Sequence, residues 1–238
     1  MQKKLLLISN STNAGEDYLG WPKPIINNFF SGTNIKRVLF VPYAGVSMSY
    51  KDYTAKVQEV FENFGLEVYS IENEPNRIRA INLAEAIAVG GGNTFHLVYM
   101  LHKLSLMDTI YEKVNAGTPY IGWSAGANIA CPSMKTTNDM PVIEPESFNC
   151  LNLVPFQINV HYLDANPSGH GGETREQRIQ EFLVVNPEIN VVGLREATAL
   201  LIDGHAVRLL GSRSARIFHE GTEPREMESG TDLSFLLK

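Results

Sequence analysis

Short, nearly continuous apolar runs recur along the first half of this 238-residue chain, and they constrain its fold more than any other feature. The runs cover residues 5–9, 38–43, 66–71, 86–89 and 120–123. Strands with one solvated face alternate apolar and polar residues, whereas strands of a parallel sheet covered on both faces are apolar throughout. The runs therefore predict buried parallel strands.

Amphipathic segments separate these runs, at residues 24–30, 50–64, 94–103 and 108–116. The second segment repeats its large apolar side chains at the spacing of one helix face: Tyr53, Val57, Val60, Phe61 and Phe64. Strands that alternate with helices in this way are typical of an α/β fold. We therefore expect a doubly wound, mostly parallel sheet.

The second half of the chain is less regular. Prolines interrupt a loop-rich stretch at 131–154, and the pattern then predicts a strand at 156–161, a glycine-rich loop at 168–172 and a strand at 191–194. The capping box Thr174-Arg-Glu-Gln177 predicts a helix that ends near Val185. Asp203-Gly204, between two apolar runs, predicts a hairpin. Because no repeat, linker or low-complexity segment divides the chain, we expect a single domain over residues 1–238.

Charge and composition argue against several classes of protein. The chain has 20 basic and 26 acidic residues and a net charge of −6, whereas nucleic-acid binders need a concentrated basic face. No stretch approaches the roughly 18 apolar residues of a membrane span, and the run at 5–8 is too short for an export signal. Cys131 and Cys150 are too few for a disulfide scaffold or a cysteine-based zinc site. We expect a cytoplasmic monomer or homodimer that uses no metal or cofactor and binds neither nucleic acid nor membrane.

The segment Gly122-Trp-Ser124-Ala-Gly126 directly follows an apolar run and is the clearest sign of chemistry. A G-x-S-x-G pattern between a strand and a helix is the nucleophile elbow of serine hydrolases. The flanking glycines permit a tight turn that exposes the serine oxygen, and the next amide, on Ala125, would then face a developing oxyanion. The alternative is a glycine-lined turn in which Ser124 only caps a helix.

A second glycine-rich segment, Gly90-Gly-Gly-Asn93-Thr94, again joins a predicted strand to a helix. Consecutive glycines let a backbone approach a ligand closely, and the exposed amides at a helix N-terminus attract negative charge. The segment lacks the lysine of a phosphate-binding P-loop. We expect Gly92 to supply the second oxyanion amide and Asn93 to contact substrate; a plain tight turn is the alternative.

A serine nucleophile needs a base, and the chain has six histidines. His161 ends a predicted strand, where doubly wound sheets place their sites, and His170 in the glycine-rich loop is the second candidate. A carboxylate must then fix the imidazole tautomer. Glu196 and Asp139 are the candidates, with Asp164 a weaker third, and the residues alone do not rank Glu196 above Asp139.

Several blocks, in order, resemble peptidase E, the α-aspartyl dipeptidase family of serine peptidases. The resemblance extends through about Leu194 and rests on residues 5–12, 41–46, 90–95, 120–128, 136–141 and 172–179. It implies a sheet related to that of class I glutamine amidotransferases. It also implies hydrolysis of small peptides that begin with aspartate, Asp-X, with no cofactor.

The resemblance also implies a role for each matching residue. Ser124 would be the nucleophile, His161 the base and Glu196 the orienting acid, while Asp139 matches an aspartate also assigned to the relay. Arg175 matches an arginine proposed to bind the aspartyl side chain, since a carboxylate calls for a bidentate cation.

The sequence departs from the family pattern beside two of these residues, and it leaves other functions open. Val160 and Arg195 stand where relatives carry or favour proline, next to His161 and Glu196. One alternative is a cyanophycinase-like β-aspartyl peptidase or an amidotransferase-like acyl hydrolase. The other is a non-catalytic binding protein on the same fold.

Overall fold

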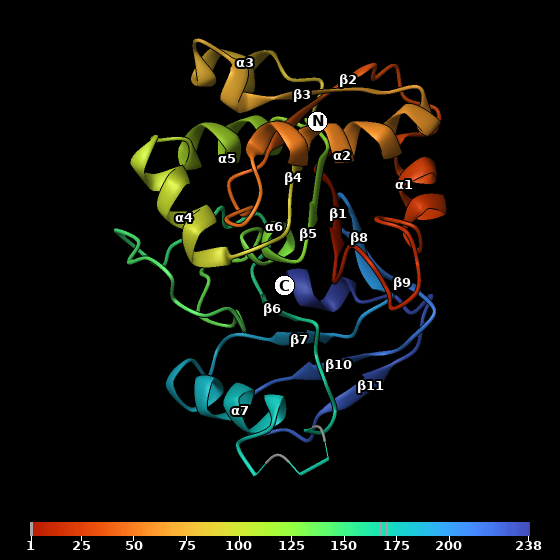
Figure 1. Cartoon of the computed structure of the whole chain (residues 1–238). Helices are drawn as coiled ribbons and strands as arrows, with labels where there is room; N and C mark the ends of the chain where they lie inside the picture. Colours follow the sequence, from red (N-terminus) through yellow and green to blue (C-terminus); the bar gives the residue numbers. More distant parts are fainter. Residues whose placement is uncertain (1, 167, 170) are drawn as a thin grey trace.

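The apolar runs of the first half form the parallel part of a seven-stranded sheet with the order β3-β2-β4-β5-β1-β8-β9 (Figure 1). The computed structural model describes residues 2–166, 168–169 and 171–238. Strands β3 to β1 pair in parallel, whereas β8 and β9 join in antiparallel pairing. The strands are β1 (Lys4–Ile8), β2 (Arg37–Val41), β3 (Glu67–Ser70), β4 (Ala86–Val89), β5 (Tyr120–Trp123), β8 (Thr198–Asp203) and β9 (Ala206–Gly211). The predicted α/β fold with a mostly parallel sheet is confirmed.

Helices cover both faces of this sheet, which explains why its strands are apolar throughout. Alternate residues of one strand enter different hydrophobic clusters, Leu5 one and Leu6 the other. One face packs against α3 (Arg77–Leu83), α4 (Thr94–Lys103) and α5 (Met107–Asn115). The opposite face packs against α1 (Lys23–Phe30) and α2 (Tyr50–Phe61).

A second sheet of four strands, ordered β11-β10-β7-β6, was not predicted. Its strands are β6 (Gln157–Val160), β7 (Val191–Leu194), β10 (Ala215–Phe218) and β11 (Arg225–Met227). Helix α7 (Arg175–Val185) packs on it, with Ile179 and Leu183 in one small cluster with Phe218. Ile158 and Val192 belong to the main core cluster together with residues of the first sheet. Periodicity predicted β6 and β7 as strands, but it carries no information about which strands pair.

The structure corrects several smaller expectations. Helix α2 ends at Phe61 and continues as one turn of 3₁₀ helix, η1 (Glu62–Phe64), closed by Gly65. Helix α3, capped by Asn76, was missed because its seven residues bury few side chains, and two short 3₁₀ helices, η2 (Ile71–Asn73) and η3 (Ser234–Leu237), were not predicted either. The predicted hairpin is present, with Gly204 and His205 between the paired strand ends. No helix in the described part of the chain is long and apolar enough to cross a membrane.

Candidate active site

Ser124 occupies a strained position between β5 and the short helix α6 (Ala125–Asn128). Its backbone angles are φ 52° and ψ −113°, a conformation that L residues rarely adopt and that persists only when the surroundings enforce it. The Ser124 N–H donates a hydrogen bond of 2.9 Å to Ile8 O, which ties the turn to β1. This geometry is that of the predicted elbow.

The two glycines that flank the elbow are required for close packing rather than for the turn itself. A Cβ on Gly122 would lie 2.2 Å from Gly126 O, and a Cβ on Gly126 would lie 2.1 Å from Val89 O. Neither glycine has a positive φ, so Ser124 itself carries the unusual dihedral. Close approach of the backbones of β4, β5 and α6 therefore explains both glycines.

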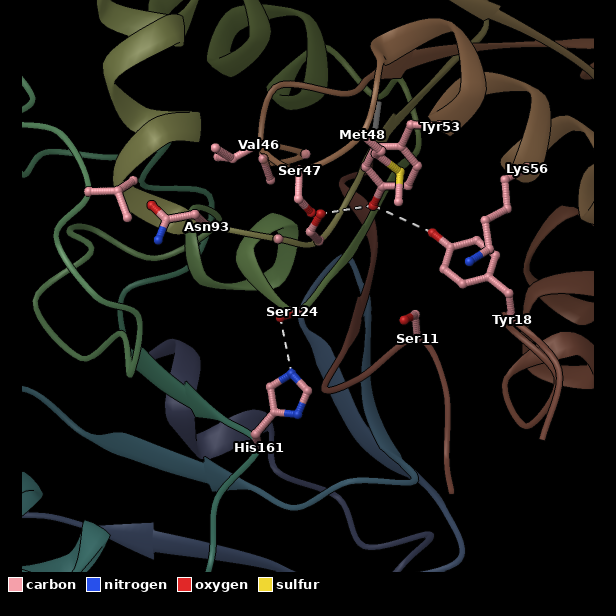
Figure 2. Close-up of a pocket in the computed structure, with 15 residues that line it drawn as sticks. Ser11, Tyr18, Val46, Ser47, Met48, Tyr53, Lys56, Asn93, Ser124 and His161 are labelled. Atoms are coloured by element: carbon pink, nitrogen blue, oxygen red, sulfur yellow. Dashed lines mark hydrogen bonds between the residues drawn. The ribbon is translucent and has the colours of Figure 1, made fainter. Parts of the chain in front are cut away.

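His161 lies between Ser124 and Glu196. Its Nε2 is 3.1 Å from Ser124 Oγ, and its Nδ1 is 2.9 Å from Glu196 Oε1 (Figure 2 shows the first contact). Residues 161 and 196 follow the parallel neighbours β6 and β7, so both side chains emerge at the same sheet edge. The backbone N–H of His161 donates to Ser9 Oγ at 3.0 Å, and the Ser9 hydroxyl donates to the backbone carbonyl of Leu194 at 2.7 Å. Ser9 thus joins the ends of β1, β6 and β7.

The row Ser124–His161–Glu196 has the arrangement of a nucleophile, a base and an orienting acid. A carboxylate at Nδ1 favours the tautomer with its proton there, which leaves Nε2 free to accept a proton from the serine hydroxyl. The His161 and Glu196 side chains are 41% and 43% exposed, so a ligand can reach them from solvent.

The other candidate residues for this relay lie elsewhere. Asp139 Oδ2 accepts the Thr94 N–H at 2.7 Å, at the start of α4, and within the described residues no hydrogen bond or ion pair joins it to His161. Asp164 pairs with Arg195. His170 lies outside the residues that the structure describes.

The segment Gly90–Asn93 lies directly against the elbow. A Cβ on Gly91 would lie 3.0 Å from Ser124 Cβ, and one on Gly92, where φ is +136°, would lie 2.1 Å from Ala44 O. Asn93 caps α4, with its Oδ1 accepting the His96 N–H at 3.0 Å. Asn93, predicted to contact substrate, therefore has a structural task, and it lines the cavity beside Ser124.

The amides of Gly92 and Ala125, predicted to face an oxyanion, donate to no acceptor within the described part of the chain. Tyr53 orients the Gly92 amide, because its hydroxyl donates a hydrogen bond of 2.9 Å to Gly91 O. The Gly91 C=O and the Gly92 N–H belong to one trans peptide group and point in opposite directions, so fixing the carbonyl also fixes the N–H. Trp123 Nε1 donates to the same hydroxyl at 3.2 Å. The sequence marked Tyr53 only as a helix-face residue, and no local pattern distinguishes it from a core tyrosine.

A cavity of about 430 Å³ opens beside Ser124 (Figure 2). Its lining comes from the loops after β1, β2 and β6, from helix α2, from both glycine-rich segments and from Val142. It includes Ser11, Tyr18, Met48, Lys56, Gly92 and His161. It therefore lies at the carboxyl ends of the parallel strands, where doubly wound sheets bind ligands. No group of three or more metal-ligating side chains occurs in the described ranges.

Arg175 is the first residue of α7 and is not among the residues that line this cavity. Its guanidinium makes no ion pair in the part of the chain that is described. Burial lowers the pKa of Arg175, the neighbouring Arg178 lowers it further, and Asp139 acts in the opposite direction. Arg175 is therefore a half-buried cation whose charged form burial and Arg178 disfavour and Asp139 favours.

Arg195, one of the departures from the family pattern, braces the loop that carries Glu196. Its guanidinium binds both carboxylate oxygens of Asp164 and lies 2.8 Å from Glu226 Oε1, and it donates to Ser214 O at 3.0 Å. The two carboxylates raise the pKa of Arg195, whose side chain is only 11% exposed. The loops that follow His161 and β7 are thereby linked to β11.

A family model described as Peptidase family S51 matches residues 5–210. The chain belongs to this family. Proteins named Peptidase E are similar to it over nearly their whole length. The one from Nostoc sp. (strain PCC 7120) is 51% identical over 238 residues, which are 100% of this chain and 98% of the relative. The one from Escherichia coli O6:K15:H31 is 44% identical over 228 residues, which are 95% and 98% of the two chains.

Solved structures agree with the fold. A peptidase from an acI-B1 actinobacterium has a TM-score of 0.73 at 17% identity, covering 99% of this chain and 98% of the other, a likeness of fold alone. A Listeria monocytogenes EGD-e protein that carries the peptidase E name has a TM-score of 0.65 at 26% identity, covering 89% and 99%. The resemblance to peptidase E is confirmed, and the chain is a peptidase of this family.

Proposed function

We propose that this S51 peptidase is a serine exopeptidase that hydrolyses dipeptides with an N-terminal aspartate, Asp-X. The observation that carries the proposal is the hydrogen-bonded row Ser124–His161–Glu196 at a strained elbow. The relatives' name supports peptide hydrolysis, and the half-buried Arg175 supports an anionic side chain in the substrate. We place the reaction in the cytoplasm, because both cysteines are free thiols.

In the proposed reaction Ser124 Oγ attacks the carbonyl carbon of the aspartyl residue while His161 Nε2 takes its proton. Glu196 holds the imidazole and stabilises the imidazolium. The amides of Gly92 and Ala125 bind the oxyanion, each contributing about 2.7–4 kcal/mol to transition-state stabilisation. The imidazolium then protonates the leaving amine, and water hydrolyses the acyl-enzyme through the same groups in reverse.

The aspartyl side chain is assigned to Arg175. A guanidinium binds a carboxylate through two parallel hydrogen bonds, and an amide of the same shape cannot replace that charge. Losing such a partner costs roughly 2–5 kcal/mol, so Asn-X is expected to be a poor substrate.

Leucine release from Asp-Leu tests the proposal, with Asn-Leu, Glu-Leu and β-aspartyl-leucine alongside and Ser124→Ala as the blank. Fast release from Asp-Leu alone, lost in the variant, is the expected result. Release from the β-aspartyl peptide alone would replace the proposal with a β-aspartyl peptidase. No release from any peptide, together with no labelling of Ser124 by an active-serine phosphonate, would indicate a binding protein.

A further inference from the structure

One wall of the cavity has no task in the proposed reaction. It is formed by Tyr18 and Lys56, and it lies across Ser124 from Asn93 (Figure 2). Asp139 binds the Thr94 amide next to Asn93, and its charge acts to raise the pKa of Arg175, the residue that the proposed function assigns to the aspartyl side chain. The aspartyl side chain is therefore assigned to the Asn93 side, and the wall with Lys56 faces the other half of a substrate.

Lys56 presents a positive charge at this wall. Its Nζ lies 4.3 Å from the centre of the Tyr18 ring, which holds an ammonium group without neutralising it. Tyr18 is itself held, since its hydroxyl is 3.4 Å from that of Tyr53. Across the described ranges of the chain, no carboxylate forms an ion pair with Lys56. The ammonium is thus both positioned and available.

An Asp-X dipeptide carries negative charge on both sides of its peptide bond, the aspartyl side chain on one side and the C-terminal carboxylate on the other. With the carbonyl carbon at Ser124, the leaving residue and its carboxylate extend away from the aspartyl side. We propose that Lys56 binds the free C-terminal carboxylate of the leaving residue and so limits cleavage to short peptides. This inference rests on the proposed function and adds a specificity-determining residue to it.

The cavity lining includes exposed apolar side chains, so the test uses a peptide with an apolar leaving residue. Val46, Met48 and Val142 line the cavity and expose 55%, 42% and 55% of their surface. Leucine buries apolar surface against such side chains, so the test compares Asp-Leu with its C-terminal amide, Asp-Leu-NH₂, which differs only in lacking the carboxylate charge.

The experiment measures kcat/KM for both peptides in the wild type, in Lys56→Met and in Lys51→Met. Lys51 is an exposed lysine on the same helix that does not line the cavity, so its variant controls for the loss of one positive charge. We expect the wild type and Lys51→Met to favour Asp-Leu by about 10- to 100-fold, the range of a charge-assisted hydrogen bond. In Lys56→Met we expect Asp-Leu to fall to the level of an unchanged Asp-Leu-NH₂.

Aspartyl p-nitroanilide, which has an aspartyl side chain but no carboxylate on the leaving group, separates two kinds of failure. If this compound is cleaved and the wild type also treats Asp-Leu and its amide alike, the role of Lys56 is overturned while the proposed function stands. An unchanged preference in Lys56→Met would overturn it equally. If none of the three compounds is cleaved, the proposed function fails, and this inference fails with it.

Discussion

Glu196 and Asp139 show how the same chemical group takes different roles through its partners. Glu196 Oε1 faces His161 Nδ1 at 2.9 Å, whereas Asp139 Oδ2 accepts a backbone N–H at the start of α4. The Glu196 carboxylate determines which nitrogen of the His161 imidazole carries the proton, whereas the Asp139 carboxylate holds a loop against the start of α4. Glu196 follows a predicted strand and Asp139 lies in a loop-rich stretch. The sequence could not rank them, because neither lies near His161 in the chain.

Glu196→Gln is therefore expected to lower kcat on Asp-Leu by about 10³- to 10⁴-fold, since the amide can donate to Nδ1 and stabilise the wrong tautomer. Asp139→Asn is expected to lose less than about tenfold, because its Oδ1 can still accept the Thr94 N–H. Steady-state kinetics of the two variants measures the difference. Equal losses would contradict the assignment of Glu196 as the orienting acid.

Tyr53 offers a second test at the residue scale. In Tyr53→Phe the Gly91 carbonyl loses its donor, so the Gly92 amide is less firmly aimed. We expect kcat to fall about tenfold with KM unchanged, a smaller effect than the 10²- to 10³-fold loss of a whole oxyanion donor. The matched control is Tyr50→Phe, on the same helix but outside the cavity lining. A rise in KM alone would instead indicate that Tyr53 contacts substrate.

Residues that act through local motifs were the ones that the sequence could place. The elbow pattern pointed to Ser124, and the end of a predicted strand made His161 the first candidate for the base. No motif marks the segments that contain Tyr18, Tyr53 and Lys56. The contacts of these side chains join residues 35 or more positions apart, or depend on which side of a helix faces the cavity. Such contacts become visible only once the sheet order is known.

At the scale of elements, the Arg195 ion pairs join the loops after β6 and β7 to β11. The Arg195 guanidinium lowers the pKa of both Asp164 and Glu226. A carboxyl whose folded-state pKa is lowered adds stability at neutral pH and loses that contribution as the pH falls through the lowered value. The brace is therefore expected to weaken in acid.

We expect the free energy of unfolding to fall on acidification more steeply in the wild type than in Arg195→Met. In the variant, Asp164 and Glu226 return toward ordinary pKa values, so less of the stability depends on their charge. Denaturant unfolding at a series of pH values from neutral to acid measures both slopes. Parallel curves for the two proteins would show that the ion pairs contribute nothing to stability.

Periodicity predicted the strands of the parallel sheet and most of the helices that cover it, because continuous apolar runs and helical spacing of apolar residues are local signals. It failed for α3, where few side chains are buried, and for the pairing of β6, β7, β10 and β11. Pairing depends on contacts between residues distant in the chain, which single-sequence patterns do not record.

At the scale of the whole molecule, one hydrophobic cluster includes residues of both sheets, and Cys131 lies in it fully buried. Burial raises the pKa of the Cys131 thiol to about 12. A thiol reagent reacts with the thiolate, so Cys131 is expected to be unreactive near neutral pH until the core opens.

The Cys150→Ser variant isolates this thiol for measurement. We expect its labelling rate by a thiol reagent to match the rate or equilibrium of global unfolding across a denaturant series. Rapid labelling without denaturant would show that the core around Cys131 opens locally.

The bonding of His161 to groups from both sheets has a consequence for the whole molecule. Ser124 follows a strand of the seven-stranded sheet, whereas His161 and Glu196 follow strands of the four-stranded sheet, and Ser9 bonds across the junction. In the proposed reaction, proton transfer from Ser124 to His161 therefore depends on how the two sheets are positioned relative to each other. A substitution in the packing between them, remote from any ligand, would misalign proton transfer before it unfolded the chain, so kcat reports on the junction more sensitively than thermal melting.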